Sequence, residues 1–331
     1  MDCAACFRSQ KAAWEMLKTS APVLASALIV VVACVSAPSQ QPFHSAPLDI
    51  THSRPYVMVL VNGKGPFRFV VDTGTGGQAF VTSELVDELG LPEAGQIHLN
   101  DPSGQGGRKV PMVLIQSIEV AGVQFAGVKA AVHNLDFGDG SCQGLLGFVL
   151  FRNYLLTLDY PKRQMVLAQG NLAPDGGRSV LPFRMPDGIP IVSVAIGRKT
   201  IDAQLDSGGA GLSLPQELTS PLKFSSSSAS LSNAQSLSTR FMIKGATLAT
   251  DIRVGSYIFK RPFVEINPAF PIANFGSVPM QNFALTFDQT NLLIRFEAQR
   301  RVLHLSATPG AIRLINAPPA QPPDSTLVPV G

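Results

Sequence analysis

The sequence is poor in charged residues and in histidine, and both shortages exclude classes of function. Only 15% of the 331 residues are charged, and the 26 basic residues nearly balance the 23 acidic ones. No long block of either sign occurs, whereas a nucleic-acid-binding surface needs concentrated basic charge, so we expect no nucleic-acid partner. The five histidines are scattered without an HxxH or HExxH spacing, so we expect no metal site. A P-loop and a G-x-S-x-G nucleophile elbow are also absent.

Cysteine is equally scarce. The chain has four cysteines, and the CxxC formed by Cys3 and Cys6 has no second pair, which argues against a zinc site. Outside the N-terminal 34 residues only Cys142 remains, so we expect no intrachain disulfide in the folded part. Cys142 is interpreted as a small buried residue rather than as a nucleophile.

The clearest apolar run covers residues 21–33 and is short for a membrane span, which needs about 20 residues. Its thirteen residues suit the core of a signal peptide, and its end, VVAC, resembles a bacterial lipobox with Cys34 as the lipidated residue. We therefore expect residues 1–34 to be a lipoprotein-type signal peptide. The protein would be exported to the periplasm or cell envelope and would contact the membrane only through this N-terminal anchor. A plain signal peptide, an uncleaved anchor and a start at Met16 are the alternatives.

Composition divides the remainder of the chain. Residues 35–47 are rich in Ser, Pro and Gln and are predicted to form a tether, and the Pro-rich residues 307–331 are predicted to be disordered. The 29 Gly and 26 Pro, together with many short β-branched runs, predict an all-β fold. The segment GNLAPDGG, residues 170–177, separates two predicted lobes, residues 48–171 and 178–306.

These two lobes resemble copies of one unit. The alternating segment VMVLVNG ends nine residues before Asp72, and IVSVAIG ends nine residues before Asp206. Counted from Gly147 and from Gly276, both halves have Asn at plus six, an aromatic at plus seven, Leu at plus nine, Thr at plus ten and Asp at plus twelve. A duplicated β unit predicts a pseudo-twofold arrangement in which the two strand-end aspartates meet on the axis.

Two carboxyl groups that meet in this way have a defined chemistry. They cannot both ionise cheaply within hydrogen-bonding distance, so the pair shares one proton. The ionised member can then act as a general base on a water molecule, while the protonated member donates to a substrate carbonyl. Asp72 and Asp206 are therefore the candidate catalytic residues.

The residues after each aspartate fit the same purpose. Gly74 and Gly208 would let backbone N–H groups approach the carboxylates closely. Thr73 and Ser207 each bring a hydroxyl that could cross-brace the two loops. Thr75 could also hydrogen-bond its own aspartate. These five residues are predicted to orient the pair of Asp72 and Asp206, which is called the dyad below.

The tripeptides Asp72-Thr73-Gly74 and Asp206-Ser207-Gly208 resemble the two active-site motifs of aspartic proteases. The segment Leu145-Leu146-Gly147, followed by LFRNYLLTLDY, resembles the corresponding element of the retropepsin-like branch of the pepsin clan, which includes exported, single-chain, two-domain bacterial proteins. The resemblance implies an all-β fold of two pseudo-twofold-related acid-protease β-barrel lobes, with the active site in the cleft between them.

The same resemblance implies an activity. It is the hydrolysis of peptide bonds in a peptide or protein substrate by an activated water, without a covalent intermediate and without a cofactor. One chain supplies both aspartates, so a homodimer is not required. Hairpin flaps would cover the cleft, and the Gly-rich residues 100–109 are the candidate flap of the first lobe.

Three features depart from the family pattern. Gly209 stands where Thr75 stands in the first copy, so the two aspartates are expected to have different surroundings. Asn274 and Phe275 stand where two apolar residues are expected, and a buried Asn amide needs hydrogen-bond partners. The Ser-rich residues 223–236 have no assigned role.

These departures keep alternative interpretations open. The chain could be an inactive protease-like fold that binds peptides or cell-envelope components. It could also be a glycosidase, which would separate the two carboxylates by about 5 to 10 Å. An Asp before Gly is commonly a turn former, and Asp159 and Asp288, which also correspond across the copies, are interpreted as turn residues.

Overall fold

The computed structural model describes residues 43–134, 142–235 and 240–306. The predicted signal peptide with Cys34 and the predicted tail 307–331 lie outside the described residues. In the described ranges no helix is long and apolar enough to cross a membrane. Both halves of the repeat belong to a single compact unit of the chain.

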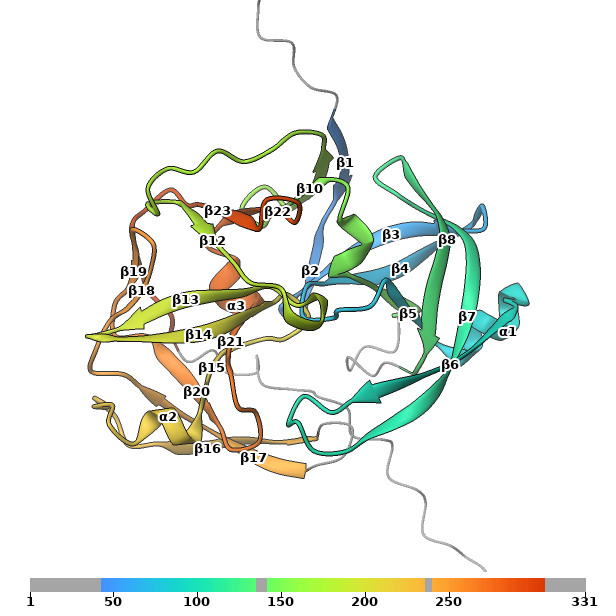
Figure 1. Cartoon of the computed structure of the whole chain (residues 1–331). Coiled ribbons are helices and arrows are strands. Elements are labelled where there is room, and N and C mark those ends of the chain that lie inside the picture. The colour runs from blue at the N-terminus through green and yellow to red at the C-terminus, as the bar shows by residue number, and fades with distance from the viewer. Residues whose placement is uncertain (1–42, 135–141, 236–239, 307–331) are drawn as a thin grey trace, which may run out of the picture. The chain divides into compact units, whose positions relative to one another are not determined.

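The first half folds into an eight-stranded sheet in the order β2-β3-β4-β9-β5-β8-β7-β6, drawn in blue to green in Figure 1. Its strands are β2 (Asp49–Thr51), β3 (Arg54–Val61), β4 (Lys64–Asp72), β5 (Ala79–Val81), β6 (Glu93–Asn100), β7 (Gly107–Val120), β8 (Val123–Val132) and β9 (Gly144–Gly147). β4 runs parallel to β9, and β5 runs parallel to β8. A further pairing of β3 with β7 curls the sheet back on itself.

Two short helical elements complete the first half. Helix α1 (Ser83–Leu89) begins at Thr82, whose side chain accepts from the Leu85 N–H, and ends at Gly90 in the left-handed conformation. This combination of a Thr N-cap and a Gly C-cap satisfies the exposed ends of a short helix. The 3₁₀ helix η1 (Phe148–Phe151) follows β9 directly.

The second half forms a ten-stranded sheet, drawn mostly in yellow and orange in Figure 1. Its strands are β13 (Ile191–Ile196), β14 (Lys199–Asp206), β15 (Leu212–Pro215), β16 (Ala229–Gln235), β17 (Arg240–Thr247), β18 (Ile252–Val254), β19 (Tyr257–Phe259), β20 (Phe263–Asn267), β21 (Ala273–Gly276) and β24 (Val302–Leu303). Its helical elements are η2 (Pro186–Gly188), α2 (Gln216–Thr219) and α3 (Ser277–Met280). Seven neighbouring strands, β13-β14-β21-β15-β20-β17-β16, repeat the order β3-β4-β9-β5-β8-β7-β6 of the first half.

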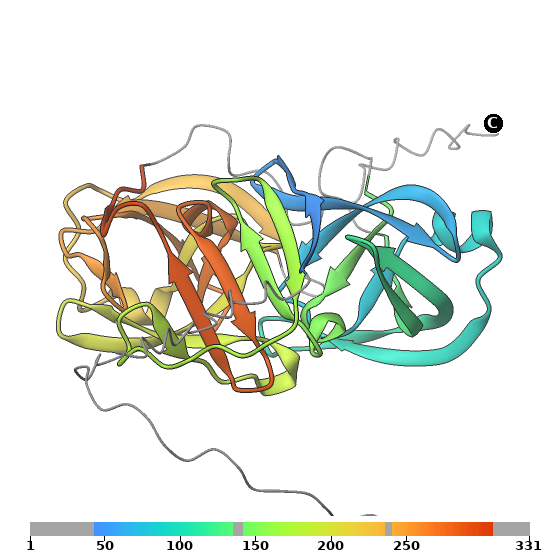
Figure 2. The ribbon, with the colours of Figure 1, turned by 90° about the horizontal axis from the view of Figure 1, so that it is seen from above.

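A third, six-stranded sheet combines strands of both halves in the order β1-β11-β10-β22-β23-β12. Its members are β1 (Phe43–Pro47), β10 (Leu155–Asp159), β11 (Gln164–Ala168), β12 (Val180–Pro182), β22 (Ala284–Asp288) and β23 (Leu293–Glu297). At its centre β10 and β22 pair antiparallel with Thr157 opposite Thr286, and their hydroxyl oxygens are 2.9 Å apart. Figure 2 shows the green pair β10 and β11 beside the red-orange pair β22 and β23.

Thr157 and Thr286 occupy the same position in the two copies, ten residues after Gly147 and Gly276. A strand that pairs with its own copy at equivalent residues lies on a local twofold axis. The matching strand orders and this central pair confirm the all-β fold and the internal repeat predicted from the sequence.

The predicted tether, residues 35–47, is wrong at its C-terminal end. Phe43–Pro47 forms the edge strand β1, which pairs antiparallel with β11. Its counterpart at the opposite edge of the sheet is β12. Ser and Pro hide this strand in the sequence, but an edge strand tolerates Pro because one side of it makes no ladder hydrogen bonds.

Strand alternation sends one face of each large sheet into a common core. On β4, Phe69 and Val71 are fully buried in that core, which extends through both halves to Phe287 and Phe296. Burial of this much apolar surface is the main stabilising contribution to the fold. Buried aromatic rings meet edge to face, for example Phe148 and Phe287 at 5.1 Å between centroids.

The structure also bears on the smaller predictions. Asp159 accepts from the Lys162 N–H and Asp288 from the Asn291 N–H, so both are turn residues as predicted. Cys142 is buried, also as predicted. Residues 100–109 form the tip of the β6–β7 hairpin, and their role as a flap stays a prediction. The Ser-rich residues 223–236 include the edge strand β16.

Candidate active site

The two candidate aspartates are the last residues of corresponding strands. Asp72 ends β4 and Asp206 ends β14. Opposite them, on the parallel neighbouring strands, stand Gly147 and Gly276. A methyl group on Gly276 would lie 2.5 Å from the Gly211 carbonyl oxygen, so glycine is needed where the loop after Asp206 folds back over the sheet. The same close approach occurs at Gly147, against the carbonyl of Gly77.

Two buried hydroxyls tie the loops together in a crossed arrangement. The Thr73 N–H donates to Ser207 Oγ at 2.9 Å, and the Ser207 N–H donates to Thr73 Oγ1 at 3.0 Å. The Thr73 hydroxyl donates to the Leu205 carbonyl, and the Ser207 hydroxyl donates to the Val71 carbonyl, both at 2.7 Å. Neither Thr73 nor Ser207 has exposed surface, so these four bonds form out of contact with water. They bring the ends of β4 and β14 face to face.

Gly74 and Gly208 lie against the opposite carboxylates. A methyl group on Gly208 would lie 2.5 Å from Cγ of Asp72, and one on Gly74 would lie 2.5 Å from Cγ of Asp206. Both distances are far below van der Waals contact. The absence of a side chain at these two positions is therefore what allows the two aspartates to approach.

Each carboxylate accepts one backbone and one side-chain hydrogen bond. Asp72 accepts from the Gly74 N–H at 2.8 Å and from the Thr75 hydroxyl at 2.9 Å. Asp206 accepts from the Gly209 N–H at 2.7 Å and from the Asn274 amide Nδ2 at 2.9 Å. Asn274 comes from β21, so the second loop takes its side-chain donor from a neighbouring strand.

Sequence reasoning identified Gly209 and Asn274 as separate departures, and the structure shows that they are linked. A methyl group on Gly209 would lie 2.5 Å from Asp206 Oδ2 and 2.6 Å from Asn274 Nδ2. Glycine at position 209 therefore leaves the space that the Asn274 amide needs. The expected difference between the two aspartates takes this form: a hydroxyl donor on one side and an amide donor on the other.

Arg54 is a contact that sequence reasoning missed. It begins β3, is only 3% exposed, and its Nε donates to the Gly208 carbonyl at 2.7 Å. A residue of the first half thus holds the loop that follows Asp206 in the second half. Nothing in the local sequence distinguishes Arg54 from a surface arginine, because its partner is 154 residues away.

Burial and the neighbouring charge of Asp206 raise the pKa of Asp72 to about 7. The hydrogen bonds from Thr75 and Gly74 oppose this rise. Burial also raises the pKa of Tyr160, and the charges of Asp206 and Asp72 contribute to that rise. Both aspartates keep some solvent-accessible surface. A raised carboxyl pKa is what two acids brought close together in a buried site produce.

Residues 57–150 match the family model described as aspartyl protease. The match covers most of the eight-stranded sheet, including Asp72 and the segment from Leu145 to Gly147, and supports a protease-like function. It confirms, for the first half, the resemblance inferred from the sequence motifs. A search of curated proteins found no match to the chain.

Asp206 lies outside the segment that matches the aspartyl protease model. The internal repeat and the crossed hydrogen bonds link it to that segment. In the described part of the chain, no three His, Cys, Asp or Glu side chains lie close enough together to hold a metal ion.

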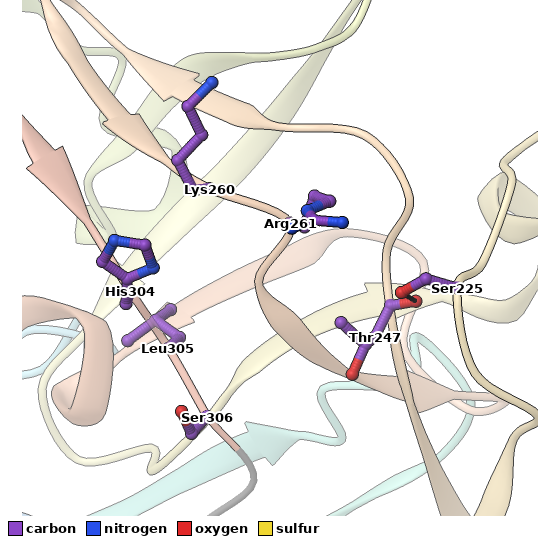
Figure 3. Close-up of a pocket in the computed structure, with 7 residues that line it drawn as sticks. All are labelled: Ser225, Thr247, Lys260, Arg261, His304, Leu305 and Ser306. Atoms are coloured by element: carbon purple, nitrogen blue, oxygen red, sulfur yellow. Dashed lines mark hydrogen bonds between the residues drawn. The ribbon is translucent and has the colours of Figure 1, made fainter.

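A pocket of about 450 Å³ lies elsewhere in the second half, where Lys260, Arg261 and His304 line it with four other residues (Figure 3). It contains neither dyad aspartate, and its Lys260 is already paired with Asp251 at 2.8 Å.

Proposed function

We propose that the protein is an aspartic endopeptidase that hydrolyses peptide bonds with a water held between Asp72 and Asp206. The observation that carries the proposal is the shared dyad itself. Two strand-end carboxyls, whose loops are held by crossed hydrogen bonds from Thr73 and Ser207, lie close enough for the charge of Asp206 to raise the pKa of Asp72. A glycosidase would need its carboxylates about 5 to 10 Å apart, and the packing of each aspartate against the glycine of the opposite loop argues against that alternative.

The proton distribution assigns a role to each aspartate. Because the pKa of Asp72 is raised to about 7, Asp72 carries the shared proton below that pH. Asp206, which accepts from the Gly209 N–H and from Asn274, is assigned the role of general base. Asp206 takes a proton from the water, whose oxygen attacks the substrate carbonyl carbon, while Asp72 donates its proton to the carbonyl oxygen. Collapse of the tetrahedral intermediate breaks the C–N bond, the proton held by Asp206 passes to the leaving amine, and one hydroxyl of the intermediate returns a proton to Asp72.

The remaining expectations belong to the same proposal. The substrate is a peptide or protein bound between the two halves, one chain suffices for catalysis, and the protein is exported and anchored by lipid on Cys34. Incorporation of labelled fatty acid into the wild type but not into Cys34→Ser tests the anchor. If both incorporate label equally, lipidation at Cys34 is wrong.

The activity is tested with a mixed peptide library and the purified chain without its predicted signal peptide. We expect cleavage at acidic to mildly acidic pH, and loss of cleavage in Asp72→Asn and in Asp206→Asn with unchanged folding. Asp87→Asn, an exposed change on α1, is the matched control and should cleave like the wild type. If either dyad variant keeps wild-type cleavage, the dyad assignment is wrong. If the wild type cleaves nothing between pH 3 and 8, the peptide-binding alternative gains.

A further inference from the structure

The face of the sheet that carries the dyad differs sharply between the two halves. In a strand, residues two apart lie on the same face, and residues paired across neighbouring strands share that face. In the first half, Val70 precedes Asp72 by two, Leu145 pairs with Val70, and Phe80 pairs with Leu145. With Tyr56 and Cys142 these residues form an apolar cluster separate from the main core.

The corresponding positions of the second half are polar. Gln204 precedes Asp206 by two, Asn274 pairs with Gln204, and Ser213 pairs with Asn274. The next strand adds Glu265, which pairs with Ser213. On these same strands the alternate residues, such as Leu205, Phe275 and Val264, are fully buried in the core. The polar residues therefore lie on the opposite face, with Asp206.

Glu265 lies beside the loop that carries Asp206. A methyl group on Gly211 would lie 2.7 Å from Oε2 of Glu265, so the carboxyl rests directly against the backbone of that loop. Within the described ranges Glu265 makes no hydrogen bond and no ion pair, although its side chain is half-buried. Burial raises the pKa of Glu265 to about 7, which is the response of a carboxyl that has lost water without gaining a partner.

The surroundings of Glu265 suit a long side chain with a cationic end. Gly245 pairs with Glu265 from β17, and a methyl group there would lie 2.5 Å from Leu231, and close to the ring of Phe263 as well. These apolar groups match the methylene stem of a lysine or arginine, which packs on apolar surface while its charged end is bound. On the other side, the buried amide oxygen of Asn274 has no hydrogen-bond donor among the described residues. The polar face of the second half thus has more hydrogen-bond acceptors than donors to pair with them.

We propose that Glu265 is a specificity-determining residue that binds the ammonium or guanidinium group of a substrate lysine or arginine on the Asp206 side of the scissile bond. The inference rests on the proposed peptidase function, since it places the basic residue next to the bond that the dyad cleaves. The first half has Ala131 at the corresponding position and so offers no carboxyl on the Asp72 side. The predicted substrate is therefore asymmetric around the cleavage site.

The test uses peptides that differ at one position. The library first gives the cleavage site, and peptides are then made with Arg, Met or Glu at each position flanking it. At about pH 7, where Glu265 begins to ionise, the wild type should cleave the Arg peptide about 10- to 100-fold better than the Met peptide at one of these positions, the range expected for a charged hydrogen-bonded pair. Glu265→Gln should remove most of that preference, and Glu265→Lys should shift it toward the Glu peptide. Glu119→Gln, an exposed change in the first half, should leave it intact.

A second measurement separates the two proposals. Binding of the uncleaved Arg and Met peptides is measured by fluorescence anisotropy in an Asp72→Asn background, with and without Glu265→Gln. If the wild type cleaves peptides but Glu265→Gln keeps the basic preference, the role of Glu265 is overturned and the peptidase function stands. If no peptide is cleaved, the peptidase function fails, and the binding result decides for Glu265. Tighter binding of the Arg peptide that disappears in Glu265→Gln supports it, and equal binding overturns it.

Discussion

The two dyad loops, which follow Asp72 and Asp206, differ in where they obtain a side-chain hydrogen-bond donor for their aspartate. Both give their aspartate one backbone and one side-chain donor, but the first loop carries its side-chain donor itself, in Thr75. The second loop has Gly209 at the corresponding place and takes its donor, Asn274, from strand β21. What is common to the two halves is the number of hydrogen bonds at each carboxylate and not the residue that supplies them.

The two loops are also supported from outside by different contacts. Arg54 of the first half donates to the Gly208 carbonyl. The strand pairing places Ile189 at the corresponding position of the second half, and its side chain cannot donate a hydrogen bond. The first loop instead rests on the 3₁₀ segment η2, where a methyl group on Gly76 would overlap the Asp187 carbonyl. The dyad is therefore symmetric in its carboxylates and asymmetric in its supports.

The largest expected effect comes from adding a methyl group where the loops meet. Gly74→Ala and Gly208→Ala each place a carbon against the opposite carboxylate and force the aspartates apart. We expect cleavage to fall by about 100-fold or more, since a displacement of about 1 Å costs this much. Gly77→Ala is the matched control, because its nearest neighbour would be 3.8 Å away. Library cleavage rates measure the effect, and a Gly74→Ala enzyme with the activity of Gly77→Ala would contradict it.

The crossed braces are predicted to contribute equally in the two halves. Thr73→Val and Ser207→Ala each leave a buried N–H and a buried carbonyl without a partner. Because each lost partner costs about 1 to 3 kcal/mol, we expect the free energy of unfolding to fall by about 2 to 4 kcal/mol in either variant. Urea unfolding measures this loss. Thr157→Val, at the half-buried centre of the shared sheet, should cost less than about 1 kcal/mol. A large difference between the two brace variants would show that the braces are not equivalent.

The two side-chain donors can be removed separately. Thr75→Val removes a hydrogen bond that lowers the pKa of Asp72, so that pKa should rise. The alkaline limb of kcat/KM, expected near pH 7, should then move to higher pH by up to about one unit, because one hydrogen bond is worth about 1 kcal/mol. Asn274→Leu introduces the residue that the first half has at this position, Leu145. It should instead lower kcat about tenfold, because Asp206 loses the amide donor that holds its carboxylate in place. An unchanged pH profile in Thr75→Val would contradict the role of its hydroxyl.

Much of this arrangement could be predicted from the sequence because the repeat makes each half a check on the other. Asp72 and Asp206, with their glycines and hydroxyls, stand at matching distances from matching strands, and a twofold pairing then requires them to meet. The same periodicity predicts the all-β fold. Local pattern and duplication together were sufficient for both inferences.

What the sequence could not predict depends on contacts between distant or dissimilar residues. Asn274 departed from an apolar pattern, and only the space left by Gly209 explains it. Arg54 and Glu265 reach the dyad loop through tertiary packing, which leaves no local signal. Strand β1 is hidden because an edge strand in a Ser- and Pro-rich segment lacks the alternation of a buried strand.

The smallest predicted effect is the contribution of Glu265, on the polar face of the second half, to the pH dependence of stability. Ala131 stands in the first half where Glu265 stands in the second, so only the second half has a carboxyl at this position. The pKa of Glu265 is raised from 4.5 to about 7, so between these values the folded state binds more protons than the unfolded state. Stability should therefore fall as pH rises from about 4.5 to 7 and then level off.

Glu265→Gln removes this titration, because an amide stays neutral throughout. The variant and the wild type should be equally stable near pH 4, and above pH 7 the variant should be more stable by up to about 2 kcal/mol, after allowance for solvent screening. Thermal unfolding across this pH range measures the difference, with Glu119→Gln as the exposed control. A Glu265→Gln variant that loses stability above pH 7 would mean that the carboxylate has a cationic partner within the folded chain. The carboxyl would then not be available to a basic residue of the substrate.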